Sequence, residues 1–451
     1  AVSYNNLAVL YKDTQRFQES EEMYKLALAI RERLAKANPQ AYEPDLAQSY
    51  NNLAILYKNT QRFQESEEMY KLAIAIRERL TKANPQAYEP ALAGSYYNLG
   101  NLYHATQRFQ ESESMHKSAL AIYERLAKAN PLAYEPDLAD SYYNLGYLYG
   151  DTQRFQESEA MYKSALAIRE RLAKANPQAY EPDLAVSYNN FGNLYYATQR
   201  FQESEAMYKS ALAIYERLAK ANPQAYELDL ADSYYNLANL YSDTQRFQES
   251  EAMYKSALAI RERLAKANPQ AYEPALADSY NNLAILYKNT QWFQESEEMH
   301  KSAIAIRERL AKANPQAYES VLADSYNNLA NLYSDTQRFQ ESEEMYKSAL
   351  AIRERLAKAN PQAYEPDLAG SYNNLAIVYY GTERIQECEE MFKSALAIYE
   401  HLAEDDPQVY GSDLARTYSN LAIVYNETQR FAESEEMANA AAEIRERLGI
   451  E

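Results

Sequence analysis

The sequence contains few of the residues from which catalytic centres, disulfide frameworks and metal sites are built. It has one cysteine, four histidines and nine glycines among 451 residues. A single cysteine, Cys388, excludes an intramolecular disulfide and a thiolate metal cluster. No histidine has a second histidine or cysteine at ligand spacing, and the scattered glycines form no phosphate-binding loop. We therefore nominate no catalytic residue, no metal site and no cofactor, and expect a protein that is not an enzyme.

Long apolar runs and excess positive charge are also missing. No stretch approaches the about 18 consecutive apolar residues of a membrane span, and the start does not resemble a signal peptide. The net charge of −19 and the isoelectric point near 4.9 argue against a nucleic-acid partner, which needs a basic face. These features favour a cytoplasmic protein without a membrane partner. The chain starts at Ala1, inside a repeat, and we interpret it as a fragment of a longer polypeptide.

What the sequence does contain is one unit repeated ten times. Tyrosine recurs every 46 residues, at Tyr4, Tyr50, Tyr96, Tyr142, Tyr188, Tyr234, Tyr280, Tyr326, Tyr372 and Tyr418. Nearly every other residue recurs at the same interval, so residues are also described below by their position, 1 to 46, within a unit. Stacked identical units bury a continuous core but form no unique pocket. We predict a single domain over residues 1–451, with units near 1–46, 47–92, 93–138, 139–184, 185–230, 231–276, 277–322, 323–368, 369–414 and 415–451.

Each unit has the apolar spacing of two helices. Apolar or small residues at positions 4, 7, 8, 10 and 11 mark a first helix of about 15 residues. A polar turn follows at positions 13–16, and a second helix of about 20 residues runs from Phe17 to about position 37. We expect a connector at residues 40–43, after which Pro44 opens the next helix. All 15 prolines then lie outside helix interiors, no strand pattern occurs, and the predicted class is all-α.

The conserved spacing resembles the tetratricopeptide repeat. The residues that carry the resemblance are Tyr4, Leu7, Ala8, Tyr11, Ser20, Tyr24 and Ala27, which recur with few substitutions in all ten units. The unit length of 46 exceeds the usual value of about 34 and is similar to the kinesin-light-chain type of repeat. The resemblance implies a right-handed α-solenoid, or superhelix, of ten helix-turn-helix units, with the first helices lining a concave groove. Ala438 replaces the usual aromatic residue, and residues 417–451 are therefore expected to form a C-terminal cap.

Variation among the units is concentrated at the positions that the resemblance assigns to the groove. Positions 2, 5, 9, 12 and 13 differ from unit to unit, whereas position 19 and position 21 are always glutamate. Such variation indicates diversification for recognition, or a groove that simply tolerates change. Position 31, which is arginine or tyrosine, also varies without an evident reason.

One groove position does not vary: position 6 is asparagine in every unit. An amide both donates and accepts hydrogen bonds, so this row could bind the backbone of an extended peptide; alternatively, it helps the helices to pack. We predict a contact centre in units three to six, because tyrosines gather there at groove positions and can anchor a partner. Its residues are Asn98, Asn144, Asn190, Asn236, Asn282, Tyr97, Tyr143, Tyr147, Tyr196, Tyr235, Asn101, Asn193, Asn239, Asp140 and Asp232.

The sequence favours a protein-interaction scaffold that holds an extended peptide or protein segment in the groove. Asp140, Asp151, Asp232 and Asp243 make the contact centre acidic, so we expect a basic or neutral partner. Two alternatives remain open: a sensor or regulatory arm of a larger signalling nucleotide hydrolase or protease, whose effector domain precedes this segment, and a structural spacer or self-associating array.

Overall fold

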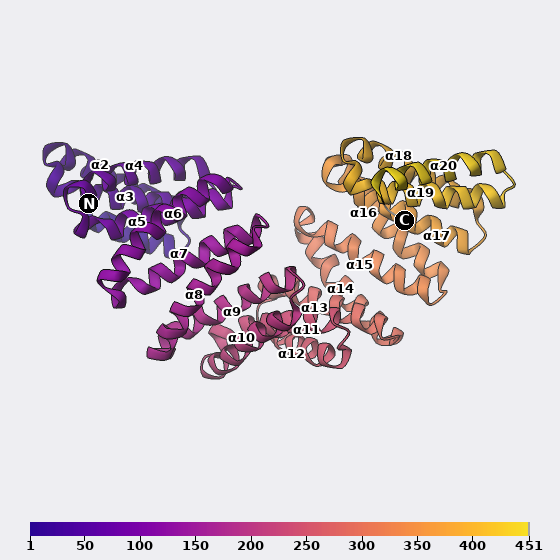
Figure 1. The fold of residues 1–451 in the computed structure, drawn as a ribbon, viewed down its shortest axis with the longest axis horizontal. Helices are drawn as coiled ribbons and strands as arrows, with labels where there is room; N and C mark the ends of the chain where they lie inside the picture. Colours follow the sequence, from indigo (N-terminus) through magenta and orange to yellow (C-terminus); the bar gives the residue numbers. More distant parts are fainter. Residues whose placement is uncertain (450–451) are drawn as a thin grey trace. The chain divides into compact units, whose positions relative to one another are not determined.

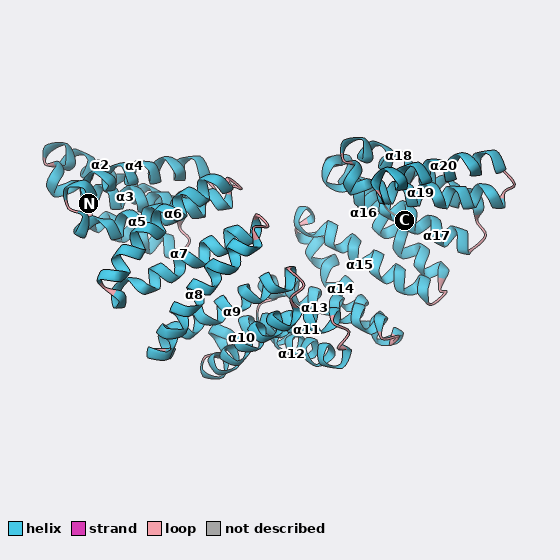
Figure 2. Cartoon of the chain, in the orientation of Figure 1, coloured by secondary structure: helices cyan, strands magenta, loops and turns pink. Residues whose placement is uncertain are grey.

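The computed structural model describes residues 1–449, and these residues form twenty α-helices and no strand (Figure 2). The chain divides into two compact units, Ala1–Tyr226 and Glu227–Glu451. From α1 to α10 and from α12 to α20, each helix packs against the next one along the chain (Figure 1). The prediction of an all-helical chain of repeated helix pairs is confirmed, whereas the single domain over all ten repeats stays a prediction.

The helices have nearly uniform lengths. The first helices of the pairs are α1 (Val2–Asp13), α3 (Pro39–Asn59), α5 (Pro85–Ala105), α7 (Pro131–Asp151), α9 (Pro177–Ala197), α11 (Pro223–Asp243), α13 (Pro269–Asn289), α15 (Pro315–Asp335), α17 (Pro361–Gly381) and α19 (Pro407–Glu427). The second helices are α2 (Phe17–Ala37), α4 (Phe63–Ala83), α6 (Phe109–Ala129), α8 (Phe155–Ala175), α10 (Phe201–Ala221), α12 (Phe247–Ala267), α14 (Phe293–Ala313), α16 (Phe339–Ala359), α18 (Ile385–Asp405) and α20 (Phe431–Leu448).

The second helices end where the sequence predicts, but the predicted connector is wrong. Residues 40–43 are helical, because Asn38 caps a helix that already begins at Pro39: its side-chain oxygen accepts a hydrogen bond from the backbone N–H of Ala41 at 3.2 Å. Pro44 therefore lies inside α3, not at its start. Its missing N–H costs one helical bond near the exposed helix start. Leu228 replaces this proline in α11 without changing the helix bounds.

The turn within each pair repeats one backbone geometry. Gln15 has a φ of 59°, in the left-handed region, and the equivalent residue of every other repeat has a positive φ as well. The backbone N–H of Arg16 donates to the carbonyl of Tyr11 at 2.8 Å, and the Thr14 hydroxyl donates to the carbonyl of Leu10 at 2.9 Å. These bonds satisfy carbonyls at the end of the first helix. The three-residue turn, residues 14–16, therefore reverses the chain and brings the two helices together.

Small buried residues set the contact between the helices. Ala8 and Ala27 are fully buried, and the Ser20 hydroxyl donates to the carbonyl of Ala8 at 2.7 Å across the pair. Cys388 takes the place of this serine in α18; it is buried, and burial raises the pKa of its thiol to about 12. His116 and His300 replace the buried Tyr24, and burial lowers the pKa of each imidazole to about 4.

A set of arginines, termed the arginine ladder, lies at the turns of nine repeats, and most of them bind a glutamate of the repeat before. The guanidinium carbon of Arg62 lies 4.2 Å from the ring centroid of Tyr57. Arg62 also donates to Glu65 at 2.8 Å and to Glu21 of the preceding repeat at 2.7 Å. The ladder consists of Arg16, Arg62, Arg108, Arg154, Arg200, Arg246, Arg338, Arg384 and Arg430.

Carboxylates of the ladder should make the protein sensitive to acid. Partial burial of Glu113 opposes its ionisation, but hydrogen bonds from Arg154, Lys117 and Tyr149 lower its pKa from 4.5 to about 2. The pKa values of Glu67 and Glu297 are lowered to about 2 in the same way. Because the unfolded chain binds protons more readily than the folded one, this contribution is complete above about pH 5 and is lost as the pH falls towards 2. We expect urea unfolding midpoints to decline across this window, and to decline less in Glu113→Gln; a midpoint that rises on acidification would contradict the expectation.

Two glycines offer a matched test of the helix packing. A Cβ atom on Gly192 would lie 2.6 Å from two ring carbons of the buried Tyr208, whereas a Cβ on Gly94 would find its nearest atom at 3.9 Å. Overpacking typically costs about 1–3 kcal/mol, against a helix-propensity gain of about 1 kcal/mol from glycine to alanine. Gly192→Ala should therefore lower the unfolding midpoint and Gly94→Ala should leave it unchanged or raise it. Equal behaviour of the two variants in thermal unfolding would show that the Tyr208 contact does not constrain the fold.

Candidate binding groove

The asparagine row forms hydrogen bonds between neighbouring repeats. Asn144 donates to the hydroxyl of Tyr97 at 2.9 Å, and Asn190 donates to the hydroxyl of Tyr143 at 2.7 Å. Asn282 of repeat seven, in the compact unit Glu227–Glu451, donates to the hydroxyl of Tyr235. The same inter-repeat bond, from position 6 to position 5 of the preceding repeat, is made by Asn52, Asn328 and Asn374. These asparagines therefore help neighbouring first helices to pack, which is one of the two roles considered from the sequence.

These bonds determine what the row can still offer to a partner. The amide nitrogen of Asn144 also donates to the carbonyl of Asp140 at 2.8 Å, and that of Asn190 donates to the carbonyl of Val186 at 3.0 Å. Both N–H groups of each amide are thus used within the protein. Only the amide oxygen of each remains, so this part of the row can accept a hydrogen bond but cannot donate one.

Three of the predicted anchor tyrosines are engaged in internal packing. The Tyr97 ring packs edge-on against His116 at 5.9 Å, and the guanidinium of Arg169 lies 4.7 Å from the Tyr143 ring centroid. Tyr235 receives the same contact from Arg261. All three tyrosines are only partly exposed and their hydroxyls accept from asparagines. Their use as anchors stays a prediction, and packing between repeats is a competing role for each ring.

The remaining predicted asparagines also lie on the first helices. Asn193 accepts a hydrogen bond from the buried Tyr208 at 2.6 Å, and Asn239 accepts one from the buried Tyr254. Asn98, Asn101 and Asn236 are partly exposed. Position 9 therefore often serves a buried phenol of its own repeat. Where the buried residue is Phe392, which has no hydroxyl, position 9 is Ile377.

The predicted acidic residues are partly neutralised. Asp140 accepts from Arg169 at 2.5 Å, and Asp232 accepts from Arg261 at 2.6 Å. Arg169 is 6% exposed and also donates to the hydroxyl of Ser187 in the next repeat. The variable position 31 is therefore a buried site at the junction of two repeats. The prediction of an acidic contact centre rests on fewer unpaired carboxylates than the sequence suggests.

Position 2 varies together with position 31, which sequence reasoning missed. In five repeats a buried arginine at position 31 donates to the residue at position 2, in the pairs Gln48–Arg77, Asp140–Arg169, Asp232–Arg261, Asp278–Arg307 and Asp324–Arg353. In three repeats position 31 is a buried tyrosine and position 2 is small or apolar, in the pairs Gly94–Tyr123, Val186–Tyr215 and Gly370–Tyr399. Variation at position 2 thus reflects internal packing in repeats two to nine. The signal was present in the sequence as covariation over 29 residues.

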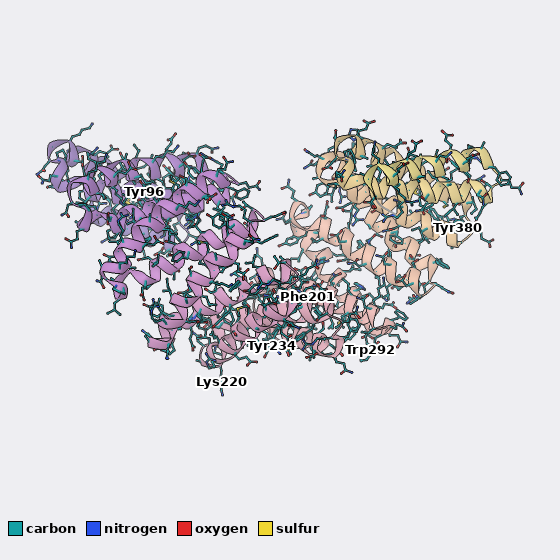
Figure 3. The ribbon with its side chains drawn as sticks, in the orientation of Figure 1. Tyr96, Phe201, Lys220, Tyr234, Trp292 and Tyr380 are labelled. Atoms are coloured by element: carbon teal, nitrogen blue, oxygen red, sulfur yellow. The ribbon has the colours of Figure 1, made fainter. Side chains whose placement is uncertain are left out.

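Positions 12 and 13 also form pairs, in this case between consecutive repeats. His104 lies 2.8 Å from a carboxylate oxygen of Asp151, and Lys288 lies 2.8 Å from Asp335. Tyr380, labelled in Figure 3, donates to Glu427. Each pair closes the gap between the ends of two neighbouring first helices.

One such gap is left open between α7 and α9. Here the paired positions hold Gly150 and Ala197, which are too small to meet, and a hollow of about 260 Å³ remains. Tyr147 lies at this hollow with 43% of its surface exposed and packs against His104 with ring centroids 5.2 Å apart. The lining residues are Tyr147, Gly150, Asp151, Phe155, Ser158, Tyr162, Asn190, Asn193, Leu194 and Ala197. Of the predicted site residues, Tyr147, Asn190 and Asn193 are therefore brought together. Tyr196 packs against Phe201 instead, with centroids 6.0 Å apart.

The pairing of positions 2 and 31 can be tested by exchanging one arrangement for the other. Asp140→Gly leaves the buried Arg169 without its carboxylate, and because Asp140 is half-exposed we expect a loss of about 1–3 kcal/mol, including the helix cost of glycine. Adding Arg169→Tyr recreates the pair found in repeats three and nine and should recover much of that loss. Urea unfolding followed by circular dichroism measures both variants. A double variant that is less stable than Asp140→Gly alone would show that the two positions are not coupled.

Several solved structures and one protein family are similar to this chain. No helix among residues 1–449 is long and apolar enough to cross a membrane. The sequence has no match among curated proteins. Similar solved structures include BtubC (BKLC) from P. vanneervenii, with 26% identity over 55% of this chain and 92% of that chain, at a TM-score of 0.45. A kinesin light chain of Podosopora anserina with nearly identical repeats has 19% identity over 49% of this chain and 97% of that chain, at a TM-score of 0.39.

A third similar structure is a signal-transduction ATPase with numerous domains from Pyrococcus horikoshii, which carries a tetratricopeptide repeat sensor. It has 14% identity over 85% of this chain and 53% of that chain, at a TM-score of 0.50, and supports the fold alone. The family described as tetratricopeptide repeat matches residues 1–79, 45–125, 91–171, 137–217, 183–263, 229–309, 321–401 and 367–447. The chain therefore belongs to the tetratricopeptide repeat family.

Proposed function

We propose that the chain is a protein-interaction scaffold that binds an extended segment of a partner along its first helices, with the contact centre at α7 and α9 of repeats four and five. Membership of the tetratricopeptide repeat family supports a protein-interaction or regulatory role, because such repeats generally bind proteins or peptides. The observation that carries the finer proposal is the hollow beside Tyr147. It combines an exposed aromatic ring with apolar walls and a few polar groups, as binding pockets commonly do.

The chemistry of the hollow defines the side chain that it would take. Phe155 and Leu194 line it with apolar surface, and Tyr147 supplies an aromatic face. Asp151, which also pairs with His104, and Asn190, whose amide oxygen remains to accept a hydrogen bond, line the same hollow, so a donor can bind there. A lysine or arginine, with an apolar stem and a donor tip, meets both requirements. This choice agrees with a net charge of −19, which attracts basic segments.

The amide row gives the extended segment a second point of contact. The free oxygens of Asn144 and Asn190 can accept from backbone N–H groups of a segment that passes along the first helices. Such contacts favour an extended partner whose backbone donors are not already used in a helix. The anchor side chain then supplies most of the sequence preference, because a few buried side chains usually dominate binding energy.

The experiment is affinity capture of partners, followed by calorimetry with the segment that binds. Tyr147→Ala should weaken binding by about 1 kcal/mol or more if the ring is an anchor. Gly150→Leu should also weaken it by filling the hollow, since a Cβ there has its nearest neighbour at 3.5 Å and the helix can accept a side chain. Both variants should keep the wild-type circular dichroism spectrum.

Leu132→Ala is the matched control, because Leu132 is 90% exposed and does not line the hollow. It should bind as the wild type does. Wild-type affinity in both Tyr147→Ala and Gly150→Leu would exclude the hollow as the anchor and move the binding surface elsewhere on the chain.

A further inference from the structure

The arginine ladder is interrupted once, at the turn between α13 and α14. There Trp292 occupies the position of the arginine and stacks on Tyr287, with ring centroids 5.6 Å apart and ring planes 16° apart. It thus covers the tyrosine face that the guanidinium covers in the other nine repeats, but it brings no charge. Figure 3 shows Trp292 at the edge of the region formed by α13 and α14.

The interruption leaves carboxylates without the cation that they have elsewhere. Glu295, at the position where Glu65 accepts from Arg62, forms no ion pair among the described residues. Glu251, at the position of Glu21, keeps Lys255 at 2.7 Å and the hydroxyl of Tyr287 at 3.1 Å but has no arginine from the next repeat. One further repeat along, Glu297 still pairs with Arg338.

The same turn exposes aromatic surface. Trp292 is 49% exposed and the adjacent Phe293 is 37% exposed. Trp292 is the only tryptophan of the chain. An exposed apolar patch next to carboxylates that lack their arginine is unlike the other turns, where the ladder arginine covers the tyrosine and contacts the carboxylates.

We propose that Trp292, Phe293, Glu295 and Glu251 form a docking site for an arginine side chain of a partner protein. A guanidinium can stack on the free face of Trp292, the aromatic ring that binds cations best. Its N–H groups can then donate to Glu295, and to the oxygen of Glu251 that the ladder arginine would otherwise take. The partner's arginine thereby supplies the positive charge that is missing because Trp292 occupies the position of the ladder arginine. This site does not depend on the groove proposal and lies on different helices.

Charge complementarity favours arginine over the other occupants. An apolar side chain would cover Trp292 and Phe293 but would leave Glu295 without a cation, and an acidic one would be repelled by both glutamates. Lysine would satisfy the charge but would stack less well and could not bridge two carboxylates in a planar fork. The partner segment is therefore expected to present arginine next to an apolar residue that covers Phe293.

Peptide selection on the full chain tests the proposal. A phage-displayed library of short random peptides is depleted on Trp292→Arg, which restores the ladder, and then selected on the wild type. Enriched peptides should contain arginine beside an apolar residue. The absence of enriched peptides, or enrichment of peptides without arginine, would overturn the proposal.

The fluorescence of the single tryptophan then measures binding of the selected peptide directly. Replacing its arginine with the neutral isostere citrulline should weaken binding by about tenfold or more, since hydrogen bonds to charged groups are the strong ones. Glu295→Gln changes an exposed carboxylate without affecting the packing and should weaken binding by about fivefold. Tyr147→Ala should bind the peptide as the wild type does. Equal affinity for the citrulline peptide, undiminished binding to Glu295→Gln, or loss of binding in Tyr147→Ala would each refute a docking site at Trp292.

Discussion

The contact between helices in this protein depends on a position at which only a methyl group fits. Ala27, Ala73, Ala119, Ala165, Ala211, Ala257, Ala303, Ala349 and Ala395 all have no exposed surface. A larger side chain there would have to separate helices that the buried serine bond holds together. Because the helices lie close, side chains on one repeat can reach the next, as Arg62 reaches Glu21 at 2.7 Å. The arginine ladder, the asparagine row and the buried arginines all act over this short separation.

The sequence predicted the helix pairs because periodicity is a local property. The turn predicted at positions 13–16 lies at 14–16, and the second helix ends at position 37 as the apolar spacing predicts. The error concerned residues 40–43, where two prolines suggested a connector. Proline is compatible with the first helical position, and Asn38 supplies the cap, so α3 begins at Pro39. Telling a helix start from a helix break required the capping hydrogen bond, which the residue types alone did not reveal.

The site was less predictable, because surface variation has two causes that look alike in a sequence. Position 2 varied as a recognition position would, but Asp140 pairs with the buried Arg169, and Gly94 accompanies the buried Tyr123. The partners lie 29 residues apart, and only the folded repeat shows that they meet. What distinguishes Tyr147, which packs against His104, is the hollow on its other side, where the neighbouring Gly150 and Ala197 are too small to fill the space. Small residues opposite one another were the available signal, and it became interpretable only with the register of α7 and α9.

The pairing of positions 2 and 31 has a consequence for how such an array can change its length. Both members of a pair lie in one repeat, so a genetic exchange between positions 32 and 46 transfers them together. An exchange between them would instead join, for example, Gly94 to Arg169, and bury a guanidinium that has no carboxylate within its repeat. Recombination breakpoints that yield a stable chain should therefore fall between positions 32 and 46, in the last turns of a second helix or the first turns of the next first helix. Whole repeats can then be gained or lost in register, each carrying its own matched pair.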